Sequence, residues 1–168
     1  YLEDGKGLSN WDQFVRIEGK TYKGTTGDVA VDHYHRFKED VKLMAEMGLK
    51  TYRFSISWPR LIPTGNGEVN EAGLKFYEDL IDECLKYNIE PMVTIFHWDL
   101  PQALVDQYNG FEDRRIIDDF VNYSKVLFER FGSKVKYWIT LNEQNVFTSL
   151  GWLTAMHPPG KFNDEKTF

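Results

Sequence analysis

Apolar residues recur along the chain with the period of a helix in three separate stretches. The first stretch begins after Asp32 and ends at Gly48, the second runs from Asn70 to Asn88, and the third ends at Gly132. In each stretch apolar residues return every three or four positions, while charged residues occupy the other face. Since Asp and Asn commonly cap helix N-termini, the pattern predicts three amphipathic helices whose first two caps are Asp32 and Asn70.

A short stretch that fits a β-strand follows each predicted helix. The strands are expected at Lys50–Ser55, Glu90–Phe96 and Lys136–Leu141. The first alternates aromatic with polar residues, and the second is apolar on both faces, which is typical of a buried parallel strand. Alternating helices and strands predict parallel pairing through right-handed crossovers. We therefore expect an α/β protein whose sheet is covered on both faces.

Two parallel α/β architectures fit this order of elements, a doubly wound sheet and a (β/α)₈ barrel. No glycine-rich phosphate-binding loop follows any of the three predicted strands, which weakens the dinucleotide-binding alternative. A complete barrel needs roughly 250 residues, whereas this chain has 168. The chain is expected to be either a small open sheet or part of a larger barrel.

Two segments show no lasting period and are predicted as loops. Residues 1–30 are punctuated by glycines, and Trp11 and Phe14 are their expected anchors. The second loop is predicted from His97 to Phe111, between the second strand and the third helix. His157, in a Pro- and Gly-containing turn near the end of the chain, is expected to be structural.

Composition excludes several classes of protein. The net charge of −6 argues against a nucleic-acid partner, because phosphate backbones favour clustered Lys and Arg. No stretch approaches the roughly eighteen apolar residues of a membrane span. The single cysteine, Cys84, excludes an internal disulfide and is expected to pack as a small apolar residue. A reducing, cytoplasmic location is compatible with it.

Polar side chains gather where the predicted strands end. Arg53 lies near the end of the first strand, His97 and Trp98 end the second, and Asn142 and Glu143 end the third. In a parallel α/β sheet the carboxyl ends of the strands form the edge at which ligands bind. We expect these five residues, called the rim residues below, to form a site.

Glu143 is the sharpest candidate for chemistry among the rim residues. Surrounding rings disfavour the ionised form of a carboxyl, so such a group can hold a proton and donate it to a leaving oxygen. The alternative is a structural ion pair with Arg53. The Asn142 amide could bind a hydroxyl or serve only as a turn residue. His97 and Trp98 could contact a ligand or be structural.

No other catalytic arrangement stands out. The sequence has no His, Cys, Asp and Glu cluster with the spacing of a metal site, and it suggests no Ser–His–Asp set. Neither a metal nor another cofactor is therefore expected.

Five segments of the chain resemble, in order, segments of glycoside hydrolase family 1, the β-glucosidase and 6-phospho-β-glucosidase family. The resemblance covers almost the whole chain. The segments are Asn-Trp-Asp-Gln-Phe at 10–14, Asp-His-Tyr-His-Arg at 32–36, Tyr-Arg-Phe-Ser-Ile-Ser-Trp-Pro-Arg at 52–60, Phe-His-Trp-Asp-Leu-Pro at 96–101 and Thr-Leu-Asn-Glu at 140–143.

The resemblance implies a retaining β-glycosidase built on a (β/α)₈ barrel. Residues 1–168 would form about strands two to four of that barrel, without its first strand and its C-terminal half. It also implies a role for each rim residue. Glu143 would be the general acid/base, Asn142 would hold the sugar 2-hydroxyl, His97 and Trp98 would line the glycone pocket, and Arg53 would keep the nucleophile charged.

The same resemblance implies a second catalytic carboxyl. The retaining mechanism needs two carboxyl groups about 5 to 5.5 Å apart. The family's nucleophile is a Glu on a later strand, which would lie beyond Phe168. Asp99 shares the rim, but nothing in the sequence suggests that it replaces the nucleophile.

The residues after Glu143 bear on the substrate. Most β-glucosidases of the family carry Pro directly after the acid/base Glu, whereas this chain has Gln144 and then Asn145. That run and residues 151–160 resemble the bacterial 6-phospho-β-glucosidase branch more closely. We therefore expect a phosphorylated small-molecule β-glycoside as substrate and no cofactor.

Several alternatives stay open at this point. The protein could be a β-glucosidase or 6-phospho-β-galactosidase of the same family, a non-catalytic sugar-binding barrel, or a half-barrel that assembles with a partner. The sequence leaves its oligomeric state open.

Overall fold

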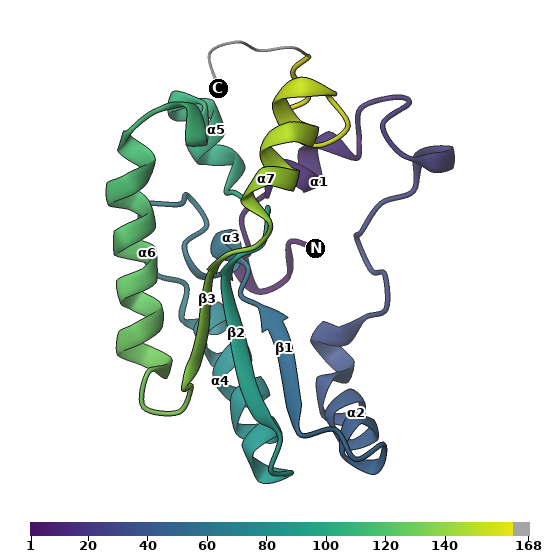
Figure 1. Cartoon of the computed structure of the whole chain (residues 1–168), viewed down its shortest axis with the longest axis vertical. Coiled ribbons are helices and arrows are strands. Elements are labelled where there is room, and N and C mark those ends of the chain that lie inside the picture. The colour runs from purple at the N-terminus through teal and green to yellow at the C-terminus, as the bar shows by residue number, and fades with distance from the viewer. Residues whose placement is uncertain (163–168) are drawn as a thin grey trace.

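The computed structural model describes residues 1–162. They contain one parallel sheet of three strands in the order β1-β2-β3 (Figure 1). The strands are β1 (Thr51–Ser55), β2 (Glu90–Phe96) and β3 (Tyr137–Leu141). Both neighbouring pairs are parallel. The predicted strands are confirmed, and each predicted start lies within one residue of the observed one.

The three predicted helices are also present. They are α2 (His33–Glu46), α4 (Glu71–Lys86) and α6 (Arg115–Phe131). Helix α4 connects β1 to β2 and α6 connects β2 to β3, so the chain contains two consecutive β-α-β units. In Figure 1 α4 lies behind the sheet, α6 runs beside β3, and α2 lies at the other edge of the sheet, beyond β1. Helix α2 contacts α4.

Short helices lie in both predicted loops and also in two other connections of the chain. Because each spans only one or two turns, none is long enough to show a helical period. The predicted 97–111 loop is wrong, since α5 takes up half of it. The short helices are α1 (Asn10–Phe14), α3 (Trp58–Leu61), α5 (Gln102–Tyr108) and α7 (Gln144–Thr148). Tighter 3₁₀ turns lie at Glu3–Gly5, Tyr22–Gly24 and Gly110–Glu112, and a π-helical turn lies at Ser149–Leu153.

The helices within residues 1–162 are all too short or too polar to cross a bilayer.

The two expected helix caps are not formed by side chains. Asp32 stands at the N-cap of α2 with a left-handed φ of 56°, and its carboxylate lies 2.6 Å from His35 Nδ1. Asn70 stands at the N-cap of α4, but its amide nitrogen donates to Asp4 O at 2.8 Å and to Arg60 O at 3.0 Å. Both side chains are held by partners other than the helix amides that a cap would satisfy.

The apolar core lies between the helices and one face of the sheet. Trp58 is at its centre, where its ring stacks on Tyr123 with centroids 4.7 Å apart and its indole nitrogen donates to Gly65 O at 2.9 Å. Cys84 is buried here as a free thiol, as expected. Fully or nearly fully buried side chains around them are Ile56, Leu61, Leu80, Ile81, Val93, Ile95, Leu127 and Phe131.

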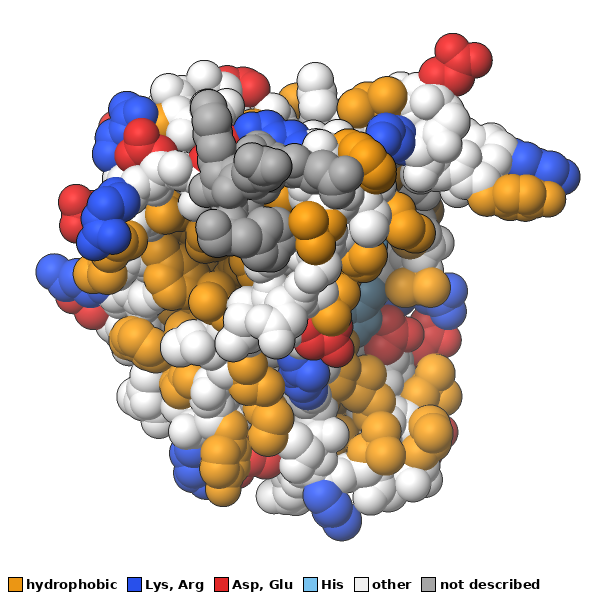
Figure 2. All heavy atoms as spheres, turned by 45° about the horizontal axis from the view of Figure 1, so that its top comes forward, with side chains coloured by type: hydrophobic (Ala, Val, Ile, Leu, Met, Phe, Trp, Pro, Cys, Tyr) orange, Lys and Arg blue, Asp and Glu red, His pale blue; other side chains and the backbone are white. Residues whose placement is uncertain are grey.

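The other face of the sheet is not covered by a helix of the described chain. The strand register places Arg53, Met92 and Tyr137 together on it, and Tyr137 is 53% exposed. Apolar side chains are visible among charged ones on this side in Figure 2. The expectation of a sheet covered on both faces is therefore wrong for residues 1–162. Consecutive right-handed crossovers place α4 and α6 on the same face.

Tyr123 offers a test of how the helices hold the sheet. Its buried hydroxyl lies 3.1 Å from Ile56 O and 3.0 Å from Ile95 O. Replacing Tyr123 by Phe removes this donor from two strand ends, so we expect a loss of about 1–2 kcal/mol in the free energy of unfolding. Urea unfolding followed by circular dichroism measures it. Tyr137→Phe, at an exposed ring, is the control, and equal stability of the two variants contradicts the expectation.

Candidate active site

The structure brings all five rim residues to the carboxyl end of the sheet, the upper end of the strands in Figure 1. Arg53 belongs to β1, His97 and Trp98 directly follow β2, and Asn142 and Glu143 directly follow β3. The β1 and β3 strands flank β2, so the five side chains come from neighbouring positions.

Asn142 connects the ends of the three strands. Its side-chain oxygen accepts a hydrogen bond from Arg53 Nη2, and Arg53 Nε also donates to Thr94 Oγ1 at 3.1 Å. Its backbone nitrogen donates to Phe96 O at 3.0 Å. Its carbonyl oxygen accepts from Trp98 Nε1 at 2.8 Å. Only 7% of Asn142 is exposed, so these bonds fix its position.

Glu143 follows this fixed residue and begins α7 with a left-handed backbone, φ 43° and ψ 59°. A non-glycine residue in this region costs on the order of 1 kcal/mol and persists only where neighbouring contacts impose it. Here the contacts of Asn142 impose it. Trp98, which bonds the same peptide, is also left-handed with φ 76°. The hydrogen bond from Trp98 to the Asn142 carbonyl therefore fixes the peptide from which Glu143 leaves the sheet.

The surroundings of Glu143 differ from the sequence expectation. Its side chain is exposed rather than enclosed by rings, because it lies at the end of a sheet with one uncovered face. Within residues 1–162 it makes no ion pair with Arg53, whose guanidinium is committed to Asn142 and Thr94. The structural ion pair considered from the sequence is therefore absent from the described chain.

His97 lies beside Trp98, with ring centroids 5.2 Å apart in an edge-on arrangement. Partial burial lowers the pKa of His97, the Arg53 charge lowers it further, and the Glu143 charge acts in the opposite direction. The imidazole is therefore neutral at neutral pH and can both donate and accept a hydrogen bond.

Asp99 lies next to the rim residues, and the sequence did not reveal its burial. Its Oδ1 is buried and has no hydrogen-bond partner in the described part of the chain. Burial raises the pKa of Asp99 to about 7, although a hydrogen bond from the Ser57 side chain and the Lys6 charge oppose this. Its place after His97 and Trp98 was the only signal in the sequence.

No group of three or more His, Cys, Asp or Glu residues among the first 162 is placed to hold a metal ion. The chemistry available at this rim is that of a carboxyl, an amide, an imidazole and a guanidinium.

Comparison with known proteins gives consistent matches over the whole chain. The family model described as Glycosyl hydrolase family 1 matches residues 1–168. The aryl-phospho-beta-D-glucosidase BglC of Bacillus subtilis is 66% identical over 166 residues, which are 99% of this chain and 35% of that protein. The coniferin beta-glucosidase of Pinus contorta is 51% identical over 157 residues, 94% of this chain and 31% of that protein. The chain thus spans about a third of the length of these curated relatives.

Solved structures give the same result for the fold. The family 1 β-glucosidase from Thermotoga maritima matches with a TM-score of 0.96 and 50% identity, over 99% of this chain and 38% of that one. The rice Os3BGlu6 β-glucosidase matches with a TM-score of 0.94 and 50% identity, over 96% and 34%. The three-stranded segment is therefore part of a (β/α)₈ barrel. A structure of the Thermotoga enzyme contains castanospermine, and a mutant of the rice enzyme forms a covalent complex with Glc.

The buried carboxyl of Asp99 makes a pH-dependent prediction. Its pKa is higher in the folded chain, about 7, than in the unfolded one, near 3.9. The stability that this group contributes is therefore present below about pH 4 and lost as the pH rises through about 7. Asn stays neutral, so the stability of Asp99→Asn relative to the unmodified chain should rise by roughly 2–4 kcal/mol across this interval.

Urea unfolding at a series of pH values measures this difference. Asp118→Asn, which removes a carboxyl from the exposed face of α6, is the matched control. A stability difference for Asp99→Asn that stays constant from about pH 4 to 8 would contradict the prediction.

Proposed function

Because the chain belongs to glycosyl hydrolase family 1, we propose that it carries the acid/base half of a retaining β-glycosidase, with Glu143 as the acid/base. Residues 1–168 then form part of the catalytic barrel, about strands two to four, and the nucleophile lies outside them. The observation that carries the proposal is the position of Glu143, exposed beside the uncovered sheet face and following the hydrogen-bonded Asn142.

The proposed reaction has two steps. A carboxylate outside this chain attacks the anomeric carbon while Glu143 donates its proton to the leaving oxygen. Glu143 then removes a proton from the water that releases the sugar from the covalent intermediate. The covalent complex of a rice relative with Glc is in keeping with such an intermediate.

Arg53 gives Asn142 a defined role in this mechanism. Because the Asn142 side-chain oxygen accepts from Arg53, the amide NH₂ group is directed elsewhere and can donate to a sugar hydroxyl. We assign it to the 2-hydroxyl. Neutral His97 and the ring of Trp98 would line the glycone pocket, and the Arg53 charge would help to keep the nucleophile ionised.

We propose a 6-phospho-β-glucoside as the substrate and the cytoplasm as the location. The 66% identity to an aryl-phospho-beta-D-glucosidase supports the substrate, as does the Gln144–Asn145 pair after the acid/base. The second candidate is an unphosphorylated β-glucoside, because relatives such as the Pinus contorta enzyme, at 51% identity, are β-glucosidases. A 6-phospho-β-galactoside and a non-catalytic sugar-binding barrel are further outcomes of the tests below.

The first test uses a chimera in which this chain replaces the matching third of the Bacillus subtilis relative. Glu143→Gln should lower kcat/KM for an alkyl β-glucoside 6-phosphate by about 10²–10⁴-fold, because a poor leaving group depends on protonation. The loss should be smaller for the 4-nitrophenyl substrate. Glu129→Gln, on the exposed side of α6, is the control.

Near-normal turnover of the alkyl substrate by Glu143→Gln overturns the role of Glu143. The unmodified chimera is also assayed with the phosphorylated and unphosphorylated glucosides and with the 6-phospho-β-galactoside. The highest kcat/KM identifies the substrate, and sugar binding without turnover of any of them points to the non-catalytic alternative.

The isolated chain should have no glycosidase activity, because it supplies one of the two carboxyls that retention requires. The assay is release of 4-nitrophenol from the aryl β-glucoside 6-phosphate. Turnover that disappears on Glu143→Gln would show that the chain is catalytic by itself.

A further inference from the structure

The chain contains two Asn-Gly pairs, and the structure holds them differently. Asn66-Gly67 lies in the connection between α3 and α4, and Asn109-Gly110 lies directly after α5. In such a pair the backbone nitrogen of Gly can attack the side-chain carbonyl carbon of Asn, because Gly has no side chain to obstruct the approach and a flexible backbone. That nitrogen must turn toward the Asn side chain, so the local structure decides which pair reacts.

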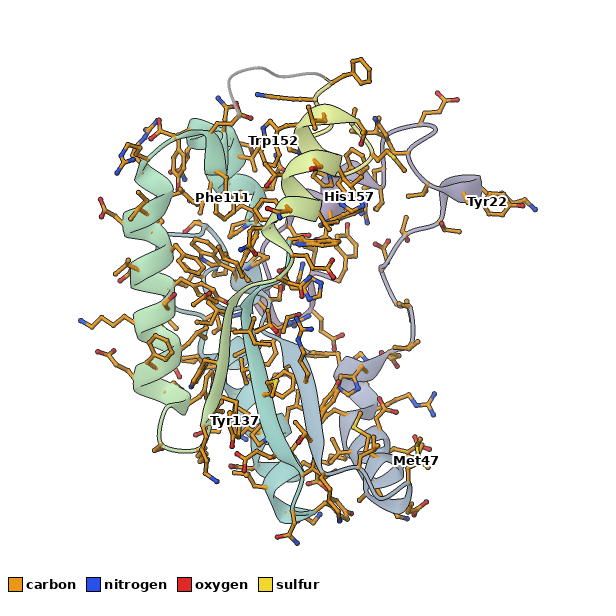
Figure 3. The ribbon with its side chains drawn as sticks, in the orientation of Figure 1. Tyr22, Met47, Phe111, Tyr137, Trp152 and His157 are labelled. Carbon is orange, nitrogen blue, oxygen red and sulfur yellow. The ribbon has the colours of Figure 1, made fainter. Side chains whose placement is uncertain are left out.

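Asn109-Gly110 is fixed by its surroundings. Asn109 stands at the C-cap of α5 in a left-handed conformation, φ 62° and ψ 21°. Gly110 is buried, and a Cβ at this position would lie 2.4 Å from Leu100 Cδ2. Phe111 anchors the turn that follows, with its ring centroid 5.0 Å from that of Phe96, and Figure 3 shows it between α5 and α7. Turning the Gly110 nitrogen toward the Asn109 side chain would disrupt this packing.

Asn66-Gly67 has none of these restraints. Asn66 is exposed in a segment without helix or strand, and the Gly67 backbone nitrogen donates to no group in the described part of the chain. The Asn66 side-chain nitrogen lies 3.4 Å from Gln107 Oε1 and 3.3 Å from Asp119 Oδ2, which is longer than most N–H···O hydrogen bonds. The attacking nitrogen is therefore free, and the side chain that it attacks is weakly held.

We propose that Asn66 is a site of spontaneous deamidation. The Gly67 nitrogen bonds to Asn66 Cγ and loses its proton to solvent, while the Cγ–Nδ2 bond breaks and Nδ2 takes up a proton and leaves as ammonia. Water then opens the resulting five-membered imide at either of its carbonyl carbons, so the product is aspartate or isoaspartate. Water is the only co-reactant, and the proposal does not depend on the glycosidase activity.

The product changes what holds this connection in place. An amide that donates to Asp119 becomes a carboxylate beside it, and the two like charges repel each other. Asp119 also accepts a hydrogen bond from Tyr108 OH, so the contact links the connection to α5 and α6. Gly65 O, next to Asn66, accepts from Trp58 Nε1 at 2.9 Å, and isoaspartate lengthens the backbone there by one carbon. Deamidation should therefore lower the stability of the chain.

The test incubates the intact chain at mildly alkaline pH, both folded and unfolded in guanidinium chloride. Peptide mapping by mass spectrometry follows the two Asn residues. In the unfolded chain both pairs should react at similar rates. Folding should slow Asn109 by at least about tenfold, because its packing must open first, and should slow Asn66 by less than about threefold.

Variants separate the reaction from its consequence. Asn66→Gln should stay unmodified, because attack on the longer side chain must close a six-membered ring, which is much slower. Asn66→Asp reproduces one product and should lower the urea midpoint of unfolding. In an Asp119→Asn background the same substitution should lower the midpoint less, because the facing charge is absent.

Protection of Asn66 by folding as strong as that of Asn109 overturns the proposal. An unmodified Asn66 in the folded chain, under conditions that convert it in the unfolded chain, does so as well. A midpoint that falls equally in both backgrounds overturns the inferred repulsion by Asp119. The deamidated chain, separated by anion exchange through its extra negative charge, gives the stability comparison without any substitution.

Discussion

The arrangement of the rim depends on the hydrogen bonds of Asn142. Three hydrogen bonds fix this residue in one position. Its side-chain oxygen is bonded to β1, its backbone nitrogen to β2 and its carbonyl oxygen to Trp98. Because Glu143 is the next residue, the same bonds hold its backbone in the left-handed conformation. The acid/base role proposed for Glu143 requires precise positioning, and in this chain the restraint comes from the peptide before Glu143.

The connections between the strands leave one face of the sheet open and keep the rim accessible from that face. Two consecutive right-handed crossovers put α4 and α6 on one side, so the other side keeps Arg53 and Glu143 accessible. In a closed barrel that side is the interior. The described residues contain three strands, which do not enclose this side, so Glu143 is exposed. The chain spans about a third of the length of its relatives.

Two buried polar groups flank Trp98, and both are pushed toward their neutral forms. Burial raises the pKa of Asp99 and lowers that of His157, opposite directions with one cause, because removal from water penalises whichever form is charged. Each also has an oxygen or nitrogen without a partner in the described chain. Unsatisfied buried groups reduce stability, so both atoms count against the packing around Trp98.

The sequence by itself determined the alternating elements, their boundaries to within a residue for the strands, and the presence of Arg53, His97, Trp98, Asn142 and Glu143 at one edge. These follow from local periodicity and from parallel pairing, which brings like strand ends together. Tertiary structure alone decided that Asp32 and Asn70 do not cap their helices, that Arg53 bonds Asn142 rather than Glu143, and that α5 replaces a loop. It also decided the burial of the unpaired Asp99 and His157 atoms in the described chain. Each of these depends on which groups meet across distant parts of the chain, and local pattern carries no information about such competition between partners.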